Sequence, residues 1–152
     1  MRELPKIDKS FIGRTRPSTS IKVEASQLRM FLRSIEEDAP IFRDPAAARA
    51  AGFRGLPIPA TYLFCLHMLS AIEPYEFYRD TGVELGRLLH GEQSFTYHAQ
   101  VCVGDELWFE AQISDVVDKK GGAMTLGPSI VRLHVADLGQ IGRQVEQSEL
   151  HP

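Results

Sequence analysis

The chain has 152 residues, of which 43% are hydrophobic, and this predicts one folded domain and excludes an intrinsically disordered chain. A net charge of -3 at pH 7 excludes the strongly basic surface that is typical of nucleic-acid binding. The five His and two Cys have no spacing typical of a zinc site, so neither a metal nor another cofactor is expected.

The sequence also indicates the compartment. Cys65 and Cys102 lie in apolar stretches, which is typical of buried free thiols in a reducing cytoplasm. The first residues contain no apolar run, so no signal peptide is expected. The longest apolar run, near Ile58 to Ile72, is too short to span a membrane. We therefore expect a cytoplasmic protein.

The N-terminal part begins with a polar segment. Residues 1–17 are expected to lie along the surface, ahead of a single domain over residues 18–148 and a tail over 149–152. Alternating apolar and polar residues predict a short strand over Thr19–Val23. Ser26 is the expected N-cap of an amphipathic helix, whose apolar positions are Leu28, Phe31, Leu32 and Ile35.

An acidic run ends this helix. It comprises Glu36, Glu37 and Asp38, and its simplest interpretation is a solvated helix end. Asp44, as an N-cap followed by proline, then predicts a second helix that ends before Gly52.

The following segment is the most informative about the fold. Arg54–Pro59, with two prolines, predicts an extended lead-in. The helix expected over Thr61–Ile72 is apolar on nearly every face. A helix of this kind in a soluble protein must be covered on nearly all sides, so the rest of the chain is expected to enclose it.

Most of the remaining sequence alternates with the period of a strand. Alternation predicts strands over Phe95–His98, Leu107–Ile113, Val131–Val135 and Ile141–Val145, with turns at Lys119–Gly122 and Asp137–Gly139. The expected architecture is α+β, with a curved antiparallel sheet wrapped around a central apolar helix, as in a hot-dog fold.

Five stretches carry a resemblance to a known family: Phe31–Phe42, Arg43–Gly55, Leu89–His98, Val103–Leu107 and Asp118–Gly122. In this order they resemble MaoC-like dehydratases of the N-terminal-domain type, and the similarity covers residues 12 to 147. The resemblance implies an R-specific enoyl-thioester hydratase or 3-hydroxyacyl-thioester dehydratase. It also implies an acyl thioester of coenzyme A or acyl carrier protein as substrate, and pairing with a second hot-dog chain.

The resemblance further implies where a catalytic carboxylate and His should lie. The family's Gly-Asp-x-Asn-Pro-Leu-His-like motif falls on residues 36–42. Glu37 takes the position of the Asp and remains a candidate catalytic carboxylate. Ala39 replaces the Asn, and Phe42 replaces the His and cannot exchange a proton. The motif is therefore degenerate.

His90 and Glu92 are the other candidate acid–base residues. Residues two apart in a strand share a face, so the two side chains are expected to approach each other. A His beside a carboxylate is suited to proton transfer. The alternative is a polar strand start or a dimer contact. His67, inside the apolar helix, is expected to be a core histidine with its hydrogen bonds satisfied.

A developing enolate needs hydrogen-bond donors, and helix N-termini provide them. The backbone N–H groups near Ala60, Thr61 and Tyr62 are the candidates for binding the thioester carbonyl. Three functions follow: a subunit working with a catalytic hot-dog partner, a homodimeric hydratase or thioesterase with rewired residues, or a module that binds acyl thioesters without turnover.

Overall fold

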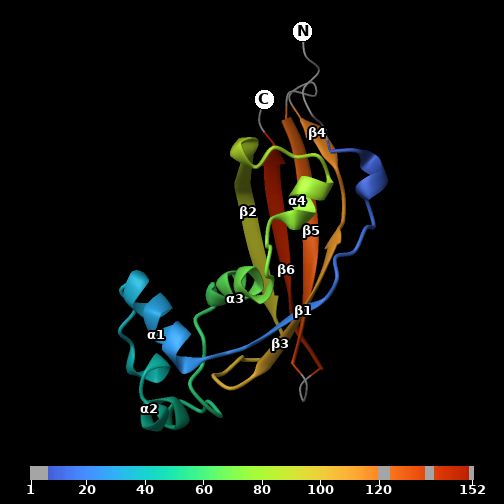
Figure 1. Ribbon diagram of the computed structural model, residues 1–152. Helices are drawn as coiled ribbons and strands as arrows, with labels where there is room; N and C mark the ends of the chain where they lie inside the picture. Colours follow the sequence, from blue (N-terminus) through green and yellow to red (C-terminus); the bar gives the residue numbers. More distant parts are fainter. Residues whose placement is uncertain (1–6, 120–123, 136–138, 151–152) are drawn as a thin grey trace.

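The computed structural model describes residues 7–119, 124–135 and 139–150. Six strands form one sheet with the order β1-β3-β5-β6-β2, and β4 pairs with β5 off this path. Every strand pairing in it is antiparallel. Figure 1 shows helix α3 lying across one face of long, curved strands, while α1 and α2 lie together beside the sheet. The predicted α+β architecture is confirmed.

The strands extend well beyond the alternating segments. They are β1 (Thr19–Lys22), β2 (Leu88–Tyr97), β3 (Glu106–Ile113), β4 (Val117–Lys119), β5 (Met124–Val135) and β6 (Gly139–Leu150). Alternation missed the first part of β5, which contains Gly127 and Pro128. There β5 changes its partner on one side from β3, which reaches Ser129, to β4, which starts at Leu126. A proline is tolerated in a strand where a ladder is interrupted.

The two predicted turns fall partly outside the described residues. Residues 120–123, which include most of the Lys119–Gly122 turn, and residues 136–138, which include most of the Asp137–Gly139 turn, are not described. The predicted strand over Ile141–Val145 lies within β6.

The helices are short, and the longest of them, α1, has 10 residues. They are α1 (Ala25–Ser34), α2 (Pro45–Ala50), α3 (Tyr62–Ser70) and α4 (Glu76–Asp80), with single 3-10 turns η1 (Lys9–Phe11), η2 (Pro40–Phe42) and η3 (Leu85–Arg87). The cap prediction at Asp44 is confirmed, because its carboxylate accepts a 2.8 Å hydrogen bond from the Ala46 N–H. Gly52 lies just after the C-cap of α2 with a left-handed backbone, at φ +90°, and ends the helix as predicted. Ser26 as N-cap is wrong, because α1 already begins at Ala25.

Helix α3 is buried on one side only. Tyr62, Leu63, Leu66 and His67 are buried, whereas Leu69 is 55% exposed. The helix ends eight residues after Tyr62, and Ile72 beyond it is 99% exposed. The expectation of burial on nearly all sides is therefore wrong for the chain alone, because the sheet covers one face of α3 and leaves an apolar strip uncovered.

The core joins α3 and α1 to the inner face of the sheet. The predicted alternation in β3 is confirmed, since its buried side chains are Leu107, Phe109, Ala111 and Ile113. The main cluster adds Leu28 and Leu32 from α1 and Leu63 and Leu66 from α3. A smaller cluster around Val83 and Val116 lies apart from it.

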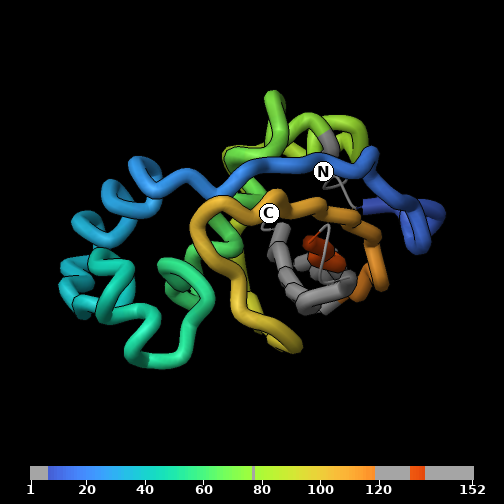
Figure 2. The backbone as a smooth tube through the Cα atoms, turned by 90° about the horizontal axis from the view of Figure 1, so that it is seen from below, coloured from blue at the N-terminus to red at the C-terminus, as the bar shows by residue number. Residues whose placement is uncertain are grey.

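The two edges of the sheet differ. An N-terminal strap, residues 12–18, continues β1 along β3, with hydrogen bonds from the Gly13 N–H to the Ile113 carbonyl and from the Arg16 N–H to the Ala111 carbonyl, both 2.9 Å. Figure 2 shows the strap running beside β3, with α1 and α2 outside the sheet. At the other edge, β2 pairs only with β6 among the described strands and exposes Leu89.

Truncating a core residue of α3 tests this packing. Leu66 is 0% exposed, so Leu66→Ala is expected to lower the free energy of unfolding by about 2–5 kcal/mol in urea titrations. The control is Met30→Ala on α1, where the side chain is 71% exposed and the cost should stay below about 1 kcal/mol. Equal losses in both variants would contradict the assigned core.

Candidate functional site

The lead-in to α3 is held against the loop before β3. Backbone hydrogen bonds join the Ile58 N–H to the Val101 carbonyl at 3.1 Å and the Val103 N–H to the Leu56 carbonyl at 2.8 Å. The Arg54 guanidinium also makes an ion pair with Asp105, which is only 9% exposed and accepts a 2.9 Å hydrogen bond from the Cys102 N–H. This clamp fixes where α3 begins.

The three candidate binding residues at this point do not behave alike. The Tyr62 N–H donates to the Pro59 carbonyl at 3.0 Å, and its side chain is buried against Phe31, with ring centroids 4.5 Å apart. Ala60 and Thr61 are exposed, and their N–H groups have no acceptor in the described part of the chain. Of the three candidate residues, Ala60 and Thr61 are therefore those whose amides are available to bind a carbonyl oxygen.

Tyr97 is a residue of this region that the sequence analysis used only as part of an alternating strand. Its hydroxyl donates a hydrogen bond to the Ala60 carbonyl, and burial raises its pKa to about 12, so it stays protonated at neutral pH. Tyr97 borders a hollow of about 210 Å³ with Ile58, Pro59, Leu63, Gln100 and others. Ala60 lines this hollow, and Thr61 follows it in the chain.

The degenerate motif forms the end of α1. Glu36, at the position of the family's Gly, has φ +55°, and the Glu37 N–H donates to the Leu32 carbonyl at 2.9 Å. This is the usual hydrogen-bond pattern of a helix end with a left-handed residue. The chain thus takes a left-handed turn here although the residue is a glutamate and not a glycine.

The side chains of the motif serve the local structure. The Glu37 carboxylate accepts a 2.9 Å hydrogen bond from the Ala39 N–H, and the Arg43 guanidinium donates to the Glu37 carbonyl. Phe42 packs against the main core. The side chain that stands at the position of the catalytic His thus points to packed side chains.

His90 and Glu92 are separated by a β-bulge. His90 pairs with Ser148 of β6 and Glu92 with Gln147, so the register shifts by one residue between them. Facing residues share a side of the sheet and neighbouring residues do not, so His90 and Glu92 lie on opposite faces. The expectation that they share a face is wrong. His90 faces α3, where its ring contacts Phe64 edge-on with centroids 5.4 Å apart.

The thiols of the chain are not activated. Burial raises the pKa of both Cys65 and Cys102, which keeps them as thiols rather than nucleophilic thiolates. Within the described residues, no group of three or more His, Cys, Asp or Glu side chains is arranged to hold a metal ion. In the same described residues, no helix has the length and apolar character needed to cross a membrane.

Comparisons with known proteins identify the family. The family described as "FAS1-like, dehydratase domain region" matches residues 10–129. The chain belongs to this family. A UPF0336 protein of Saccharopolyspora erythraea is 33% identical over 116 residues, which cover 76% of this chain and 74% of that protein.

Solved structures show that the FAS1-like dehydratase chain has the hot-dog fold. The HadBC (3R-hydroxyacyl-ACP dehydratase) complex of Mycobacterium tuberculosis aligns with a TM-score of 0.76 at 23% identity, covering 91% of this chain and 96% of that chain. A MaoC-like dehydratase of Rhodospirillum rubrum aligns with a TM-score of 0.69 at 15% identity, and 92% of each chain is covered. The predicted hot-dog fold and the resemblance to MaoC-like dehydratases are confirmed.

His67 is the one buried histidine that the described residues show in this FAS1-like dehydratase chain. It is 8% exposed and stacks on Phe109, with ring centroids 5.0 Å apart. Its predicted burial is confirmed, but its Nδ1 has no hydrogen-bond partner. Burial first, and then the charge of Arg16, lower the pKa of His67 to about 4.

Acid is therefore expected to destabilise the fold through His67. The unfolded histidine binds a proton near pH 6.5 and the folded one only near pH 4, so its contribution to stability is complete above pH 6.5 and falls as the pH drops. Chemical unfolding should show a loss of about 2 kcal/mol from this group between pH 7 and pH 5. His67→Gln should lack this loss, and an unchanged pH dependence in that variant would contradict the assignment.

Proposed function

We propose that this chain is a subunit of an acyl-thioester hydratase/dehydratase in which a second hot-dog chain supplies the catalytic carboxylate and His. The observation that carries the proposal is the state of residues 36–42. Phe42 packs against the core where a His would have to meet substrate, and the Glu37 carboxylate is engaged by the Ala39 N–H. The chain has the hot-dog fold but no acid–base pair at residues 36–42, which favours a function in which a partner chain supplies that pair.

The edge of the sheet at β2 supports the pairing part of the proposal. A row of unpaired backbone groups beside exposed apolar side chains is a site for strand pairing. Leu89 on β2 is 56% exposed and Leu69 on α3 is 55% exposed. Leu89 lies on the face of β2 away from α3, because His90 beside it faces α3. A second hot-dog chain joined at β2 would continue the sheet at an edge that exposes Leu89. The solved HadBC structure is, by its name, a complex.

We further propose that this chain contributes to binding of the acyl thioester through the N-terminal end of α3. The amides of Ala60 and Thr61 would donate to the thioester oxygen, as preorganised donors do for an enolate. Tyr62 would contribute packing rather than a donor, because its N–H is already bonded.

A rewired homodimeric enzyme is the second candidate, and His90 is the residue that favours it. It lies on the inner face of β2, close to Phe64 of α3. The bulge places Glu92 on the other face, so the pair cannot act together on one water within this chain. His90 would need a carboxylate from elsewhere, such as Glu37 or a partner.

The isolated chain is expected to hydrate crotonyl-CoA at least about 100-fold more slowly than the complex with its hot-dog partner, because its acid–base pair is missing. Loss of the enoyl absorbance measures the rate. The combined variant Phe42→His, Glu37→Asp and Ala39→Asn should remain inactive, because position 42 points into the core. Wild-type turnover that collapses in both His90→Ala and Glu37→Gln would instead establish the rewired enzyme.

The pairing surface is tested separately. Sedimentation of the wild type is expected to give a particle of at least twice 17.0 kDa, alone or with its co-purified partner. Leu89→Arg on β2 should release the 17.0 kDa chain, because a charge would be buried at the joint. Met30→Arg, at an exposed position on α1, is the matched control. A wild type that sediments as one chain and captures no hot-dog partner would refute the pairing.

A further inference from the structure

Two consecutive peptide groups carry the amides at the start of α3. The Ala60 N–H shares its peptide group with the Pro59 carbonyl, and the Thr61 N–H shares its own with the Ala60 carbonyl. The Pro59 carbonyl accepts a 3.0 Å hydrogen bond from the Tyr62 N–H. The Ala60 carbonyl accepts one from the Tyr97 hydroxyl. The helix backbone thus holds one peptide group, and a single side chain holds the other.

The hydrogen bond from Tyr97 fixes the direction of the Thr61 N–H. The peptide group between Ala60 and Thr61 is trans, and the C=O and N–H of a planar trans peptide group point in opposite directions. The Thr61 N–H therefore points away from the Tyr97 hydroxyl. A ligand oxygen bound by this amide would lie on the far side of the peptide group from Tyr97.

The helix itself does not hold this peptide group. In a regular α-helix the Phe64 N–H would bond the Ala60 carbonyl, four residues earlier. Here the Phe64 N–H bonds the Thr61 carbonyl instead, at 3.3 Å. The Ala60 carbonyl is thus left to the hydroxyl of Tyr97, which comes from a distant strand.

The same hydrogen bond also makes the Thr61 amide a stronger donor. A hydrogen bond accepted by a carbonyl polarises its peptide group, which strengthens the bond that the N–H of that group can make. Burial raises the pKa of Tyr97 to about 12, so the hydroxyl keeps its proton at neutral pH. The orientation and the polarisation are both present before any ligand arrives, as preorganised donors require.

The sheet places the Tyr97 ring independently of its hydroxyl. Tyr97 is the last residue of β2 and pairs with Gly142 of β6. Its ring stacks on that of Phe95, with centroids 5.8 Å apart, and Phe95 packs against the main core. A phenylalanine at position 97 would keep this stack and lose only the hydrogen bond to the Ala60 carbonyl.

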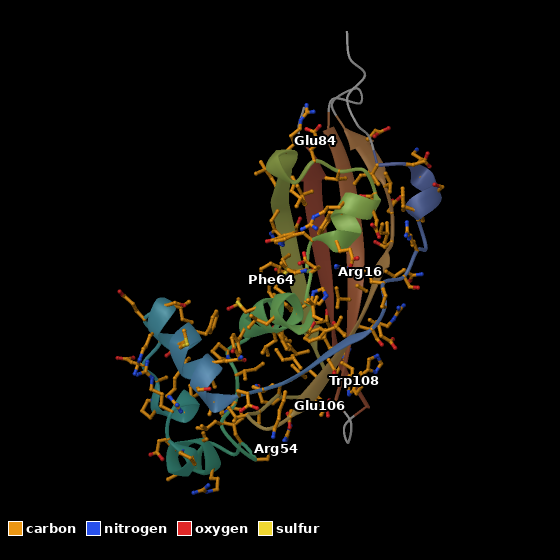
Figure 3. The ribbon with its side chains drawn as sticks, in the orientation of Figure 1. Arg16, Arg54, Phe64, Glu84, Glu106 and Trp108 are labelled. Carbon is orange, nitrogen blue, oxygen red and sulfur yellow. The ribbon has the colours of Figure 1, made fainter. Side chains whose placement is uncertain are left out.

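Other side chains hold the lead-in without orienting a donor. Figure 3 shows Arg54, which forms the clamp with Asp105, at the lower end of the structure with α3 above it. The Gln100 side-chain amide donates to the Ile58 carbonyl at 3.3 Å. The nitrogen of that peptide group belongs to Pro59 and has no hydrogen. Gln100 therefore provides a matched control for Tyr97.

We infer that Tyr97 is a positioning residue, whose hydroxyl orients the Ala60–Thr61 peptide group so that the Thr61 N–H faces the thioester oxygen. The inference rests on the proposed binding of the thioester at the N-terminal end of α3. It adds that the two donors differ in what holds them. Loss of the Tyr97 hydroxyl should weaken the Thr61 donor and spare that of Ala60, which the helix backbone orients.

Two ligands isolate the contact with the thioester oxygen. Butyryl-CoA has no double bond to hydrate, and S-butyl-CoA is the same molecule without the carbonyl oxygen. Calorimetry measures both affinities for the full chain, together with any hot-dog chain that co-purifies. The wild type should bind butyryl-CoA about tenfold or more tightly than S-butyl-CoA, because two amides donate to the oxygen.

The variants test which side chain this preference depends on. Tyr97→Phe should lower the preference for butyryl-CoA to about threefold or less. Gln100→Met removes a hydrogen bond to the same lead-in and should leave the preference within about twofold of the wild type. A variant that is partly unfolded loses affinity for both ligands equally, so the ratio of the two affinities reports the oxygen contact alone.

NMR without any ligand tests the orientation itself. The carbonyl carbon of Ala60 and the amide nitrogen of Thr61 should both move to lower chemical shift in Tyr97→Phe, because the hydrogen bond that polarises this peptide group is lost. Both resonances should stay in place in Gln100→Met.

Resonances that do not move in Tyr97→Phe, or a butyryl preference that survives in it, would each overturn the role of Tyr97 alone. A wild type that binds the two ligands equally, or binds neither, would refute the thioester site and this inference with it.

Discussion

The packing of α3 on the inner face of the sheet is the contact on which the rest of the structure depends. Leu63 and Leu66 meet the buried row of β3 in the main core, and α1 closes over the other side of the same cluster. The clamp between Arg54 and Asp105 sets where the helix starts, and the Arg16 guanidinium on the Pro74 carbonyl ties down the loop after it. Both ends of one short helix are thus held by contacts from distant parts of the chain.

Each end of α3 has polar atoms that no hydrogen bond within the described residues satisfies. At the N-terminal end two amides remain available, and Tyr97 holds the carbonyl just before them. Near the C-terminal end, Nδ1 of His67 has no hydrogen-bond partner. His67 and Arg16 both line a hollow on that side. Buried polar atoms without partners destabilise a fold, so a fold that keeps one must be stabilised elsewhere.

Residues 36–42, on which the family's motif falls by resemblance, have a structural part in this fold. Glu36 has a left-handed backbone, at φ +55°, which costs about 1 kcal/mol or more for a residue with a Cβ. Glu37 bonds a neighbouring amide, and Phe42 adds apolar contact to the core. These residues thus contribute hydrogen bonds and apolar packing to the fold.

Local patterns in the sequence by themselves predicted the α+β architecture. These patterns are the alternation of β3, the cap at Asp44 and the apolar character of α3. The resemblance placed Phe42 where the family has its His. Only the tertiary structure decided that His90 and Glu92 face apart, because a bulge depends on pairing with a strand more than fifty residues away. It also decided that Leu69 stays exposed and that Arg16 lies beside His67, since coverage and proximity arise from contacts that no local pattern encodes.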